Sequence, residues 1–321
     1  MPKLSVVVPM HNVGEFAEST LRSLANNADD TFEFLLVDDC STDSTPWAID
    51  RWAAKLPNAR VIRHEKNMGI AQARNSGIDA AGGEFITFLD GDDWYGPGHL
   101  AELVCAVEEL GCDFARTDHV QVTGKERVIR RPPARVRDAV MDPRDGIAPA
   151  DRETMVDYPF VWAGIYRRHL FDDGGMRFAT ELRTAEDRLW IWRLHLKARS
   201  YASVGLHGIF YRRGVATSLT QIKDSRQLDF IPAYDMLLRD VLDDPESDRF
   251  LLKAVRTYCA MIAFHIGKAD EYEPAAAQRL RREASAALRR MPEAALEETL
   301  GTIDRNRGRL LSRLRDGRKA A

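Results

Sequence analysis

Long apolar segments are lacking in this sequence: no uninterrupted apolar run approaches the roughly 20 residues that a membrane-spanning helix needs. The opening residues, Met1-Pro-Lys, lead into a short β-branched run instead of the apolar centre of a signal peptide. Cysteine is scarce, with 4 residues and no C-x-x-C pair, which argues against a disulfide framework and favours a reducing compartment. We therefore expect a cytoplasmic protein that is soluble or at most peripheral at the inner face of a membrane.

An excess of one charge is also lacking. The 46 basic and 49 acidic residues leave a net charge of −3, which gives no general attraction to nucleic acid. No G-x-G-x-x-G follows the first predicted strand, which argues against a dinucleotide-dependent dehydrogenase. The loop after that strand, Met10-His-Asn-Val-Gly14, has no Lys or Arg. A nucleotidyltransferase is expected to have a basic, glycine-rich phosphate-binding loop at this position. With 321 residues, 45% of them hydrophobic, the chain can bury a full core and suggests two domains, or one domain with an appendage.

A predicted buried strand at residues 85–89 runs directly into a group of acids, Asp90, Asp92 and Asp93. Carboxylates packed this closely repel one another, and a divalent cation would relieve that repulsion; oxygen ligands favour Mg²⁺ or Mn²⁺. A solvated Asp-Gly turn that closes the strand is the plain alternative.

Two other predicted strands end in polar residues at the same kind of position. The run at residues 4–9 is followed by Met10-His11-Asn12, and the run at 34–37 by Asp38 and Asp39. A loop cap for the helix after Pro46, with Ser44 or Thr45 as its N-cap, is the structural alternative for Asp38 and Asp39. Strands alternate with helices here, at 70–81 and 97–110 among others, which predicts βαβ units and a mainly parallel sheet. Ligands bind beyond the carboxyl ends of such strands, so we expect the three tips to face one crevice.

The second half of the chain follows a different pattern. Strands are expected at 113–118 and 119–129, with a turn near Gly124, and then at 160–166, 201–205 and 209–211. Residues 130–150 form a loop rich in Pro and Arg. A helix begins at Thr184, its expected cap, with Glu186 and Asp187 in the first turn. Helical periodicity dominates from about residue 225, in segments broken by prolines.

Five segments in this order resemble glycosyltransferase family 2, whose members have the GT-A fold. They are Ser5-Val-Val-Val-Pro-Met-His-Asn12, Val37-Asp-Asp-Cys-Ser-Thr-Asp43, Asn67-Met-Gly-Ile-Ala-Gln-Ala-Arg-Asn75, Phe88-Leu-Asp-Gly-Asp-Asp93 and Glu186-Asp187. The resemblance implies an α/β protein with a Rossmann-like, mainly parallel sheet and flanking helices. It implies a catalytic domain at 1–220, divided into a nucleotide-binding half (1–112) and an acceptor-binding half (113–220). The helical region at 221–321 lies outside the resemblance and receives no functional support from it.

The resemblance implies a nucleotide-sugar donor, with UDP or dTDP as its nucleotide, and a role for each matching residue. Asp92, with Asp90, would hold Mn²⁺ or Mg²⁺ against the diphosphate. Asp39 would accept a hydrogen bond from the nucleobase, and Arg74 would reach the nucleotide. The remaining nucleotide-binding residues implied are Pro9, Met10, His11, Asn12, Asp38, Asp90 and Gly91. Family members usually have an aromatic residue where this chain has His11.

The resemblance also implies a general base. Asp187 would take the proton from the acceptor hydroxyl as it attacks the anomeric carbon opposite the leaving group, which predicts inversion. Glu186 would position the acceptor or the base, and the two roles can be exchanged. Trp190 and Trp192 are expected to pack in the core, with a sugar platform as the alternative.

Three basic segments have two interpretations each. His207 is either a late metal ligand or an ordinary surface histidine. Arg212-Arg213 either hold the leaving diphosphate or form a solvated charge pair. The tail from Gly301 to Ala321 has seven Lys or Arg against two Asp, and its leucines would let it lie on an anionic membrane beside a lipid-linked acceptor; a solvated terminal helix is the alternative.

Besides a glycosyltransferase acting on a glycan, lipid-linked or small-molecule acceptor, two functions stay open from sequence. One is a nucleotidyltransferase that makes the sugar nucleotide. The other is a non-catalytic nucleotide-binding scaffold, which would bind nucleotide without turnover.

Overall fold

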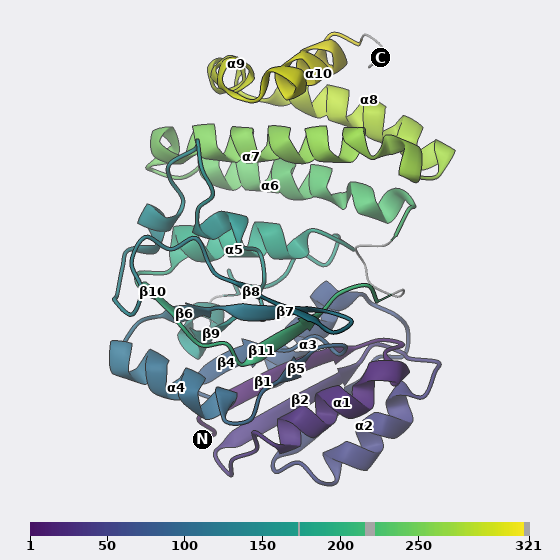
Figure 1. The fold of residues 1–321 in the computed structure, drawn as a ribbon, viewed down its shortest axis with the longest axis vertical. Coiled ribbons are helices and arrows are strands. Elements are labelled where there is room, and N and C mark those ends of the chain that lie inside the picture. The colour runs from purple at the N-terminus through teal and green to yellow at the C-terminus, as the bar shows by residue number, and fades with distance from the viewer. Residues whose placement is uncertain (173, 216–221, 318–321) are drawn as a thin grey trace.

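The computed structural model of the chain describes residues 1–172, 174–215 and 222–317, and it is built in layers (Figure 1). A seven-stranded sheet lies at the foot of Figure 1, helix α5 crosses above it, and helices α6 to α10 are stacked beyond α5. The strands are β1 (Leu4–Met10), β2 (Phe32–Asp38), β3 (Ala59–Arg63), β4 (Phe85–Phe88), β5 (Trp94–Tyr95), β6 (Phe114–Thr117), β7 (His119–Thr123), β8 (Glu126–Arg130), β9 (Gly164–Arg167), β10 (Tyr201–Val204) and β11 (Ile209–Arg212). The helices are α1 (Gly14–Ala25), α2 (Thr45–Ala53), α3 (Ile70–Ala80), α4 (His99–Leu110), α5 (Glu186–Lys197), α6 (Phe230–Leu242), α7 (Ser247–Gly267), α8 (Pro274–Arg290), α9 (Glu293–Thr302) and α10 (Arg305–Arg315).

The large sheet is mainly parallel, as the sequence predicts. Its strand order is β10-β6-β9-β4-β1-β2-β3, and β9 alone runs antiparallel to its two neighbours. Every residue of β1, β2 and β4 is buried, which explains why these strands read as continuous apolar runs with no alternation. The strand order places β1 between β2 and β4, so the carboxyl ends of all three lie at one edge.

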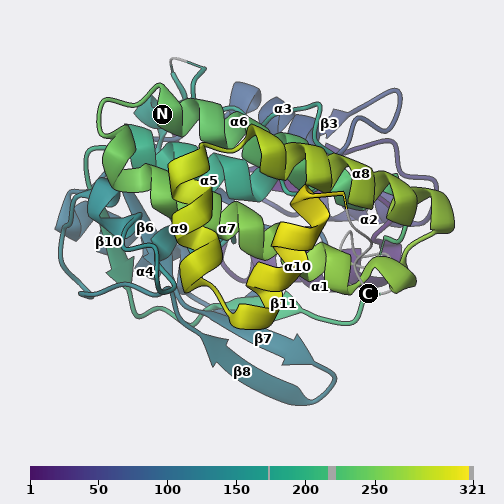
Figure 2. The ribbon, with the colours of Figure 1, turned by 90° about the horizontal axis from the view of Figure 1, so that it is seen from above.

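A smaller sheet, β5-β11-β7-β8, lies beside the large one. Its hairpin β7–β8 turns at Gly124, as predicted, and projects from the body of the molecule in Figure 2. The strand predicted at 160–166 is shorter than expected, because Phe160 to Ala163 form a turn in which Ala163 N donates to Phe160 O at 2.9 Å.

Of the two predicted helix caps, Ser44 has the predicted position but forms no capping bond, and Thr184 is wrong. Ser44 is the N-cap of α2 but makes no capping bond with its side chain, and Thr45 Oγ1 instead accepts a hydrogen bond from Val13 N at 2.9 Å. Thr184 does not cap α5: its hydroxyl donates to Arg226 O at 2.7 Å, and the N-cap is Ala185 with a φ of 60°. In both places a bond to a distant part of the chain has replaced the local one, which sequence spacing does not reveal.

The apolar core has two parts that meet at α5. The first lies on the large sheet and includes Trp190, Ile191 and Leu194 of α5. The second fills the helical layers and includes Leu189 and Trp192 of the same helix. Both tryptophans are thus core residues, as expected. The predicted boundary at residues 220–221 falls outside the described residues, but the division itself is not clean, because α5 belongs to both clusters.

Two features of the helical region bear on membranes. Helix α7 is long and apolar enough to cross one by length and composition, with a mean hydropathy of 1.2, yet 56% of that stretch is buried, as in an ordinary core helix. In α10, Leu311 and Leu314 are buried in the second cluster, while Arg307 and Arg313 are exposed. The leucines of the tail are therefore not free to enter a lipid surface; Arg318 and Lys319 lie outside the described residues.

Candidate active site

The three strand tips meet, as the sequence predicts. Asp39 N donates to Met10 O at 2.8 Å, which joins the ends of β1 and β2. Gly91 lies against the end of β1 so closely that a Cβ there would be 3.0 Å from Met10 Cγ and 3.1 Å from Pro9 O. A larger residue at this position would push the acidic loop after β4 away from β1.

The loop after β1 is fastened to the loop after β2. His11 Nδ1 lies 2.8 Å from Asp39 O, and Asn12, with a φ of 51°, accepts a hydrogen bond from Thr42 N at 2.8 Å. Asp38 Oδ1 accepts from Ser41 N at 2.9 Å. These bonds give the predicted nucleotide-binding segment, residues 9–12, a fixed conformation.

Asp39 is 2% exposed and its carboxylate already has protein partners. Met68 N and Gly69 N, just before α3, donate to its two oxygens at 2.7 Å each, and His64 Nδ1 lies 2.7 Å from Oδ1. Asp39 therefore anchors the start of α3 to the tip of β2. A carboxylate can accept about four hydrogen bonds, so the expected bond from a nucleobase would be an additional one.

The acids after β4 have unequal surroundings. Asp93 is fully buried; its Oδ1 accepts from Arg212 N at 2.7 Å, while its Oδ2 has no hydrogen-bond partner among the described residues. Burial and the charge of Asp90 raise the pKa of Asp92 to about 6. Burial and both neighbouring acids raise the pKa of Asp93 well above its usual range. The carboxyl groups after β4 are thus close together, and the positively charged side chains of the protein do not balance them.

Arg74 of α3 joins the acidic loop to the first turn of α5. Its guanidinium is 3% exposed and donates to Asp90 Oδ1 at 2.9 Å and to Glu186 Oε1 at 2.8 Å. The ring of Phe178 lies 5.2 Å from the guanidinium carbon. The contact expected between Arg74 and the nucleotide stays a prediction: Nη1 and Nη2 already donate to carboxylates, and Nε has no hydrogen-bond partner among the described residues.

Glu186 and Asp187 are the first two residues of α5, and Arg74 joins Glu186 to the acidic loop. Burial, followed by the charge of Asp187, raises the pKa of Glu186 to about 7. Burial also raises the pKa of Asp187, whose Oδ1 accepts a hydrogen bond from Arg188 N at 2.7 Å. A carboxylate whose pKa is raised in this way is a better proton acceptor near neutral pH.

Arg212 braces the acidic loop. Its Nε donates to Asp92 O at 2.9 Å, and its guanidinium lies over the rings of Phe16 and Trp94. Arg213 is exposed and donates to Tyr211 Oη at 3.0 Å. Arg212 is therefore a structural support of the loop, and Arg213 is the more accessible of the two.

His207 lies against a different acid from those expected. Its Nε2 is 3.2 Å from Asp118 Oδ2, and Arg137 donates to the other oxygen of Asp118 at 2.6 Å. Within the described ranges, no group of three or more His, Cys, Asp or Glu side chains is arranged to hold a metal ion. A cation held by Asp90 and Asp92 would thus need ligand oxygens from a bound diphosphate or water.

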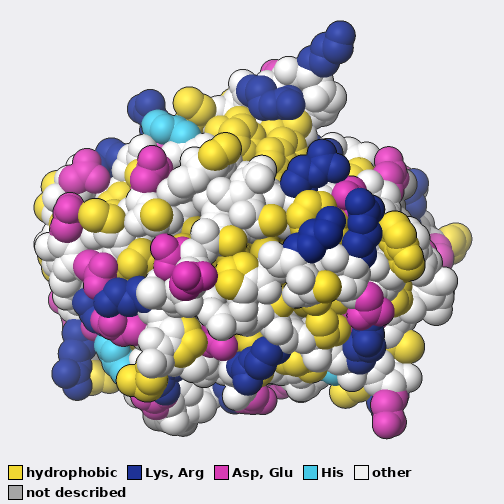
Figure 3. All heavy atoms as spheres, turned by 90° about the horizontal axis from the view of Figure 1, so that it is seen from below, with side chains coloured by type: hydrophobic (Ala, Val, Ile, Leu, Met, Phe, Trp, Pro, Cys, Tyr) yellow, Lys and Arg dark blue, Asp and Glu magenta, His cyan; other side chains and the backbone are white. Residues whose placement is uncertain are grey.

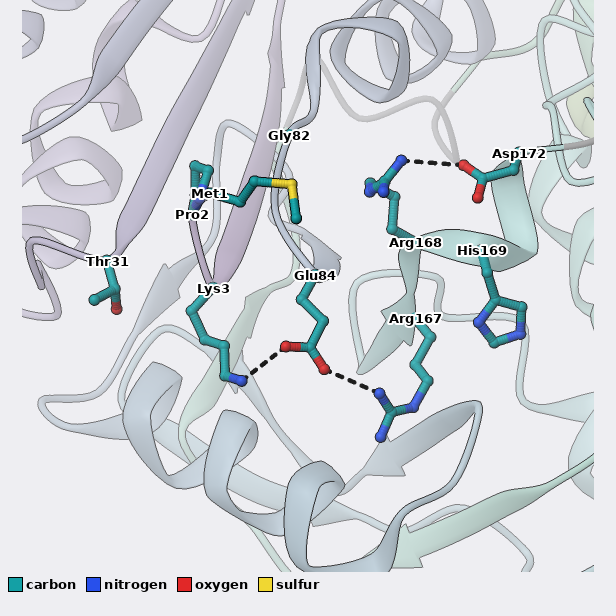
Figure 4. Close-up of a pocket in the computed structure, with 10 residues that line it drawn as sticks. All are labelled: Met1, Pro2, Lys3, Thr31, Gly82, Glu84, Arg167, Arg168, His169 and Asp172. Atoms are coloured by element: carbon teal, nitrogen blue, oxygen red, sulfur yellow. Dashed lines mark hydrogen bonds and ion pairs between the residues drawn. The ribbon is translucent and has the colours of Figure 1, made fainter.

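A cavity also lies away from this site. A cavity of about 720 Å³ opens near the amino end of the large sheet, where Lys3 and Arg167 both reach Glu84 (Figure 4). The face at the foot of Figure 1 carries basic, acidic and hydrophobic side chains interspersed with one another (Figure 3).

Two features of the site escaped the sequence analysis. His64 and its bond to Asp39 had no motif to mark them. The pairing of Arg74 with Glu186 joins residues 112 positions apart, so no local sequence pattern predicts it. The one signal in the sequence is that Arg74 is the only Lys or Arg within the helix Ile70–Ala80.

Comparisons with known proteins agree with this geometry. Residues 5–174, about half of the chain, match the family model described as "Glycosyl transferase family 2". The putative glycosyltransferase EpsH of Bacillus subtilis is 31% identical over 218 residues, which are 66% of this chain and 61% of that protein. The poly(ribitol-phosphate) beta-N-acetylglucosaminyltransferase TarS of Staphylococcus aureus is 27% identical over 263 residues, 78% of this chain but 43% of TarS. The match therefore spans less than two thirds of either relative.

Crystal structures of residues 1–349 of S. aureus TarS share the fold. The complex with UDP superposes with a TM-score of 0.75 and the complex with UDP-GlcNAc with one of 0.77. In both, sequence identity is 22%, and the superposition covers 98% of this chain and 87% of the other. The fold is thus GT-A, and the helical layers after α5 lie within the structural match.

Proposed function

This chain belongs to glycosyl transferase family 2, and from that premise we propose that it transfers a sugar from a nucleoside-diphosphate donor to an acceptor hydroxyl, with inversion. One observation carries the proposal: Arg74 ties Asp90, in the acidic loop after β4, to Glu186, the first residue of α5. A leaving diphosphate and an attacking hydroxyl need oppositely placed groups around one sugar. The contact through Arg74 supports the proposal that the acidic loop and the start of α5 serve one reaction.

For the donor we propose a uridine diphosphate sugar, with dTDP as the alternative nucleotide. The support is the shared fold with proteins crystallised with UDP and UDP-GlcNAc, together with the fixed loop at residues 9–12. Asp39 would receive the N3–H of the base in addition to its present partners.

For the metal we propose Mn²⁺ or Mg²⁺ at Asp90 and Asp92. The residues fit such an ion because they offer carboxylate oxygens, because the pKa of Asp92 is raised to about 6, and because Oδ2 of the adjacent Asp93 has no partner among the described residues. When bound, the ion would supply positive charge for the diphosphate that departs. His207 lies 3.2 Å from Asp118 Oδ2, so we do not include it among the proposed ligands.

For the general base we propose Asp187, with Glu186 as the group that positions it. Glu186 is held by Arg74, whereas no ion pair engages Asp187 within the part of the chain that the structure describes. Asp187 would take the hydroxyl proton while the acceptor oxygen forms its bond to the anomeric carbon and the bond to the diphosphate breaks. The single displacement inverts the anomeric centre.

The test is release of UDP from a panel of UDP-sugars with Mn²⁺ and an acceptor mixture. We expect turnover by the wild type and a loss of about 10²–10⁴-fold for Asp187→Asn, with UDP binding retained in a thermal-shift assay. Asp92→Ala should lose both activity and the Mn²⁺-dependent part of the UDP shift. Full activity in either variant would contradict the assigned roles.

A cytoplasmic location and contact with an anionic membrane remain predictions. Because Leu311 and Leu314 are buried, such contact would depend on the basic residues of the tail and should weaken at high salt.

A further inference from the structure

A second groove lies beside the candidate active site. It has a volume of about 540 Å³, and its walls include Gln121, Arg130 and Arg131 on one side and Asp157, Tyr158 and Phe160 on the other. The first group belongs to the hairpin β7–β8 and the residue after it, and the second to the segment before β9. None of these residues is among those that the family resemblance singles out.

The groove is connected to the acidic loop through strand β11. Gln121 pairs in register with Tyr211 of β11, and the next residue, Arg212, donates to Asp93. The ring centroid of Phe160, on the other wall, lies 5.9 Å from that of Tyr211. A molecule in the groove would therefore lie near the strand that holds the acidic loop in place.

Tyr158 and Phe160 form the aromatic floor of the groove. Arg116, fully buried, donates to the carbonyl oxygens of Tyr158 and Phe160 at 2.9 and 2.8 Å. Behind the groove, the ring centroid of Phe160 lies 5.0 Å from that of Trp162. Aromatic rings suit the apolar faces of sugar rings.

The rim of the groove is positively charged. Residues 125–137 contain six Lys or Arg and one acid, Glu126. Arg137 is committed to Asp118, but Arg130 has no ion pair within the described ranges, and its Nε contacts only Gln121 Oε1, at 3.3 Å. Arg131 is 70% exposed and is 3.8 Å from Asp118. Of the two acids in the groove, Asp157 is balanced by Lys253 at 2.5 Å, which leaves Glu153 at the edge.

We propose that this groove binds the acceptor and that the acceptor is an anionic glycan, with phosphate or carboxylate groups near the hydroxyl that receives the sugar. This inference rests on the proposed function, because it places the acceptor by reference to the donor site and the base. The guanidinium groups of Arg130 and Arg131 can each make paired hydrogen bonds to a phosphate or carboxylate, while the aromatic floor holds the ring.

Calorimetric titration of the full chain tests the groove without any donor. Three probes separate the chemistries: an oligomer of glycerol phosphate, an oligomer of galacturonic acid, and maltohexaose as a neutral sugar. We expect at least one anionic probe to bind about tenfold or more tightly than maltohexaose. The double variant Arg130→Gln/Arg131→Gln should lose about tenfold or more of that affinity, since each arginine contributes charge-assisted hydrogen bonds.

The matched control is Lys125→Gln/Arg127→Gln, which removes the same charge from the same hairpin but outside the groove. Its affinity for the anionic probe should stay within about twofold of wild type, since exposed charges at a distance are screened. Equal binding of neutral and anionic probes, an unaffected groove variant, or an equal loss in the control would each overturn the proposal.

Failure of this inference is distinguishable from failure of the proposed function. UDP binding and slow release of UDP from the donor in the absence of acceptor do not involve Arg130 or Arg131, so both should persist in the groove variant. If the wild type shows neither, the donor assignment fails, whatever the probes do.

Discussion

Arg74 is the residue on which the charges of the site depend. It is a single buried cation between Asp90 and Glu186, and the charge of Asp187 also acts on it. Burial is the main cause of the raised pKa values of Asp92 and Glu186, and the charge of a neighbouring carboxylate, Asp90 or Asp187, raises them further. The closeness of these carboxylates makes the site receptive to an added cation.

This charge arrangement predicts how stability depends on pH without ligand. The pKa of Glu186 is raised from an ordinary 4.5 to about 7, so between these values the native state binds more protons than the unfolded state. The free energy of unfolding should therefore fall as pH rises from 5 to 7, by up to about 1.4 kcal/mol per pH unit for each such group. Denaturant titrations across this range measure the slope. Glu186→Gln should make it shallower, and an unchanged slope would show that Glu186 ionises normally.

At the scale of elements, the position of Arg74 depends on how closely α3 packs on β1. Gly77, one turn further along α3, lies so near Val7 that an added Cβ would overlap Val7 Cγ1. Only glycine allows this approach, and it brings Arg74 within reach of Asp90.

We expect Gly77→Ala to lower the free energy of unfolding by about 1–3 kcal/mol and to weaken UDP binding, because α3 must move away from β1. Val7→Ala in the same chain makes room, so the double variant should be more stable than the sum of the single effects predicts, by about 0.5 kcal/mol or more. Gly267→Ala is the matched control: its Cβ would meet nothing within 4 Å, and helix propensity favours it. A purely additive result would mean that the contact is unimportant.

The elements themselves were predictable to differing degrees. Strands β1, β2 and β4 carry their own signal, because buried parallel strands are continuously apolar, and the shared edge of their tips follows from topology. A strand starting at Phe160 was wrong because Phe160 to Ala163 form a local turn. Thr184 as a cap was wrong because its hydroxyl donates to Arg226 O, a distant partner that local spacing cannot specify. The bridge from Arg74 to Glu186 was inaccessible for the same reason.

On the scale of the whole molecule, the helical region and the catalytic region are coupled through α5. Leu189 and Trp192 face the helical layers, whereas Trp190 faces the sheet. The long segment between β8 and β9 is tied to the helical layers as well: its Arg144 donates to Glu246 at 2.5 Å and to Leu196 O at 2.7 Å.

A chain truncated after residue 220 should therefore not behave as a folded catalytic domain. It would expose Leu189, Trp192 and their neighbours in the second cluster, and the first turn of α5 would lose its support. We expect little soluble protein, a dye-binding apolar surface and no cooperative thermal transition. A truncated chain with a wild-type melting temperature and UDP binding would show that the layers are independent.

The double role of α5 also bears on how such proteins can be recombined. One side of α5 packs on the sheet and the other on the final helices. A segment exchanged between relatives therefore cannot begin at α6, where the final helices begin. A chimera that borrows the C-terminal helices of a relative must borrow the outward half of α5 with them, while keeping Glu186 and Asp187 in place. If the junction lies before Ala185, the whole of α5 comes from the relative. The side chains of α5 that face the sheet must then match the sheet of this chain.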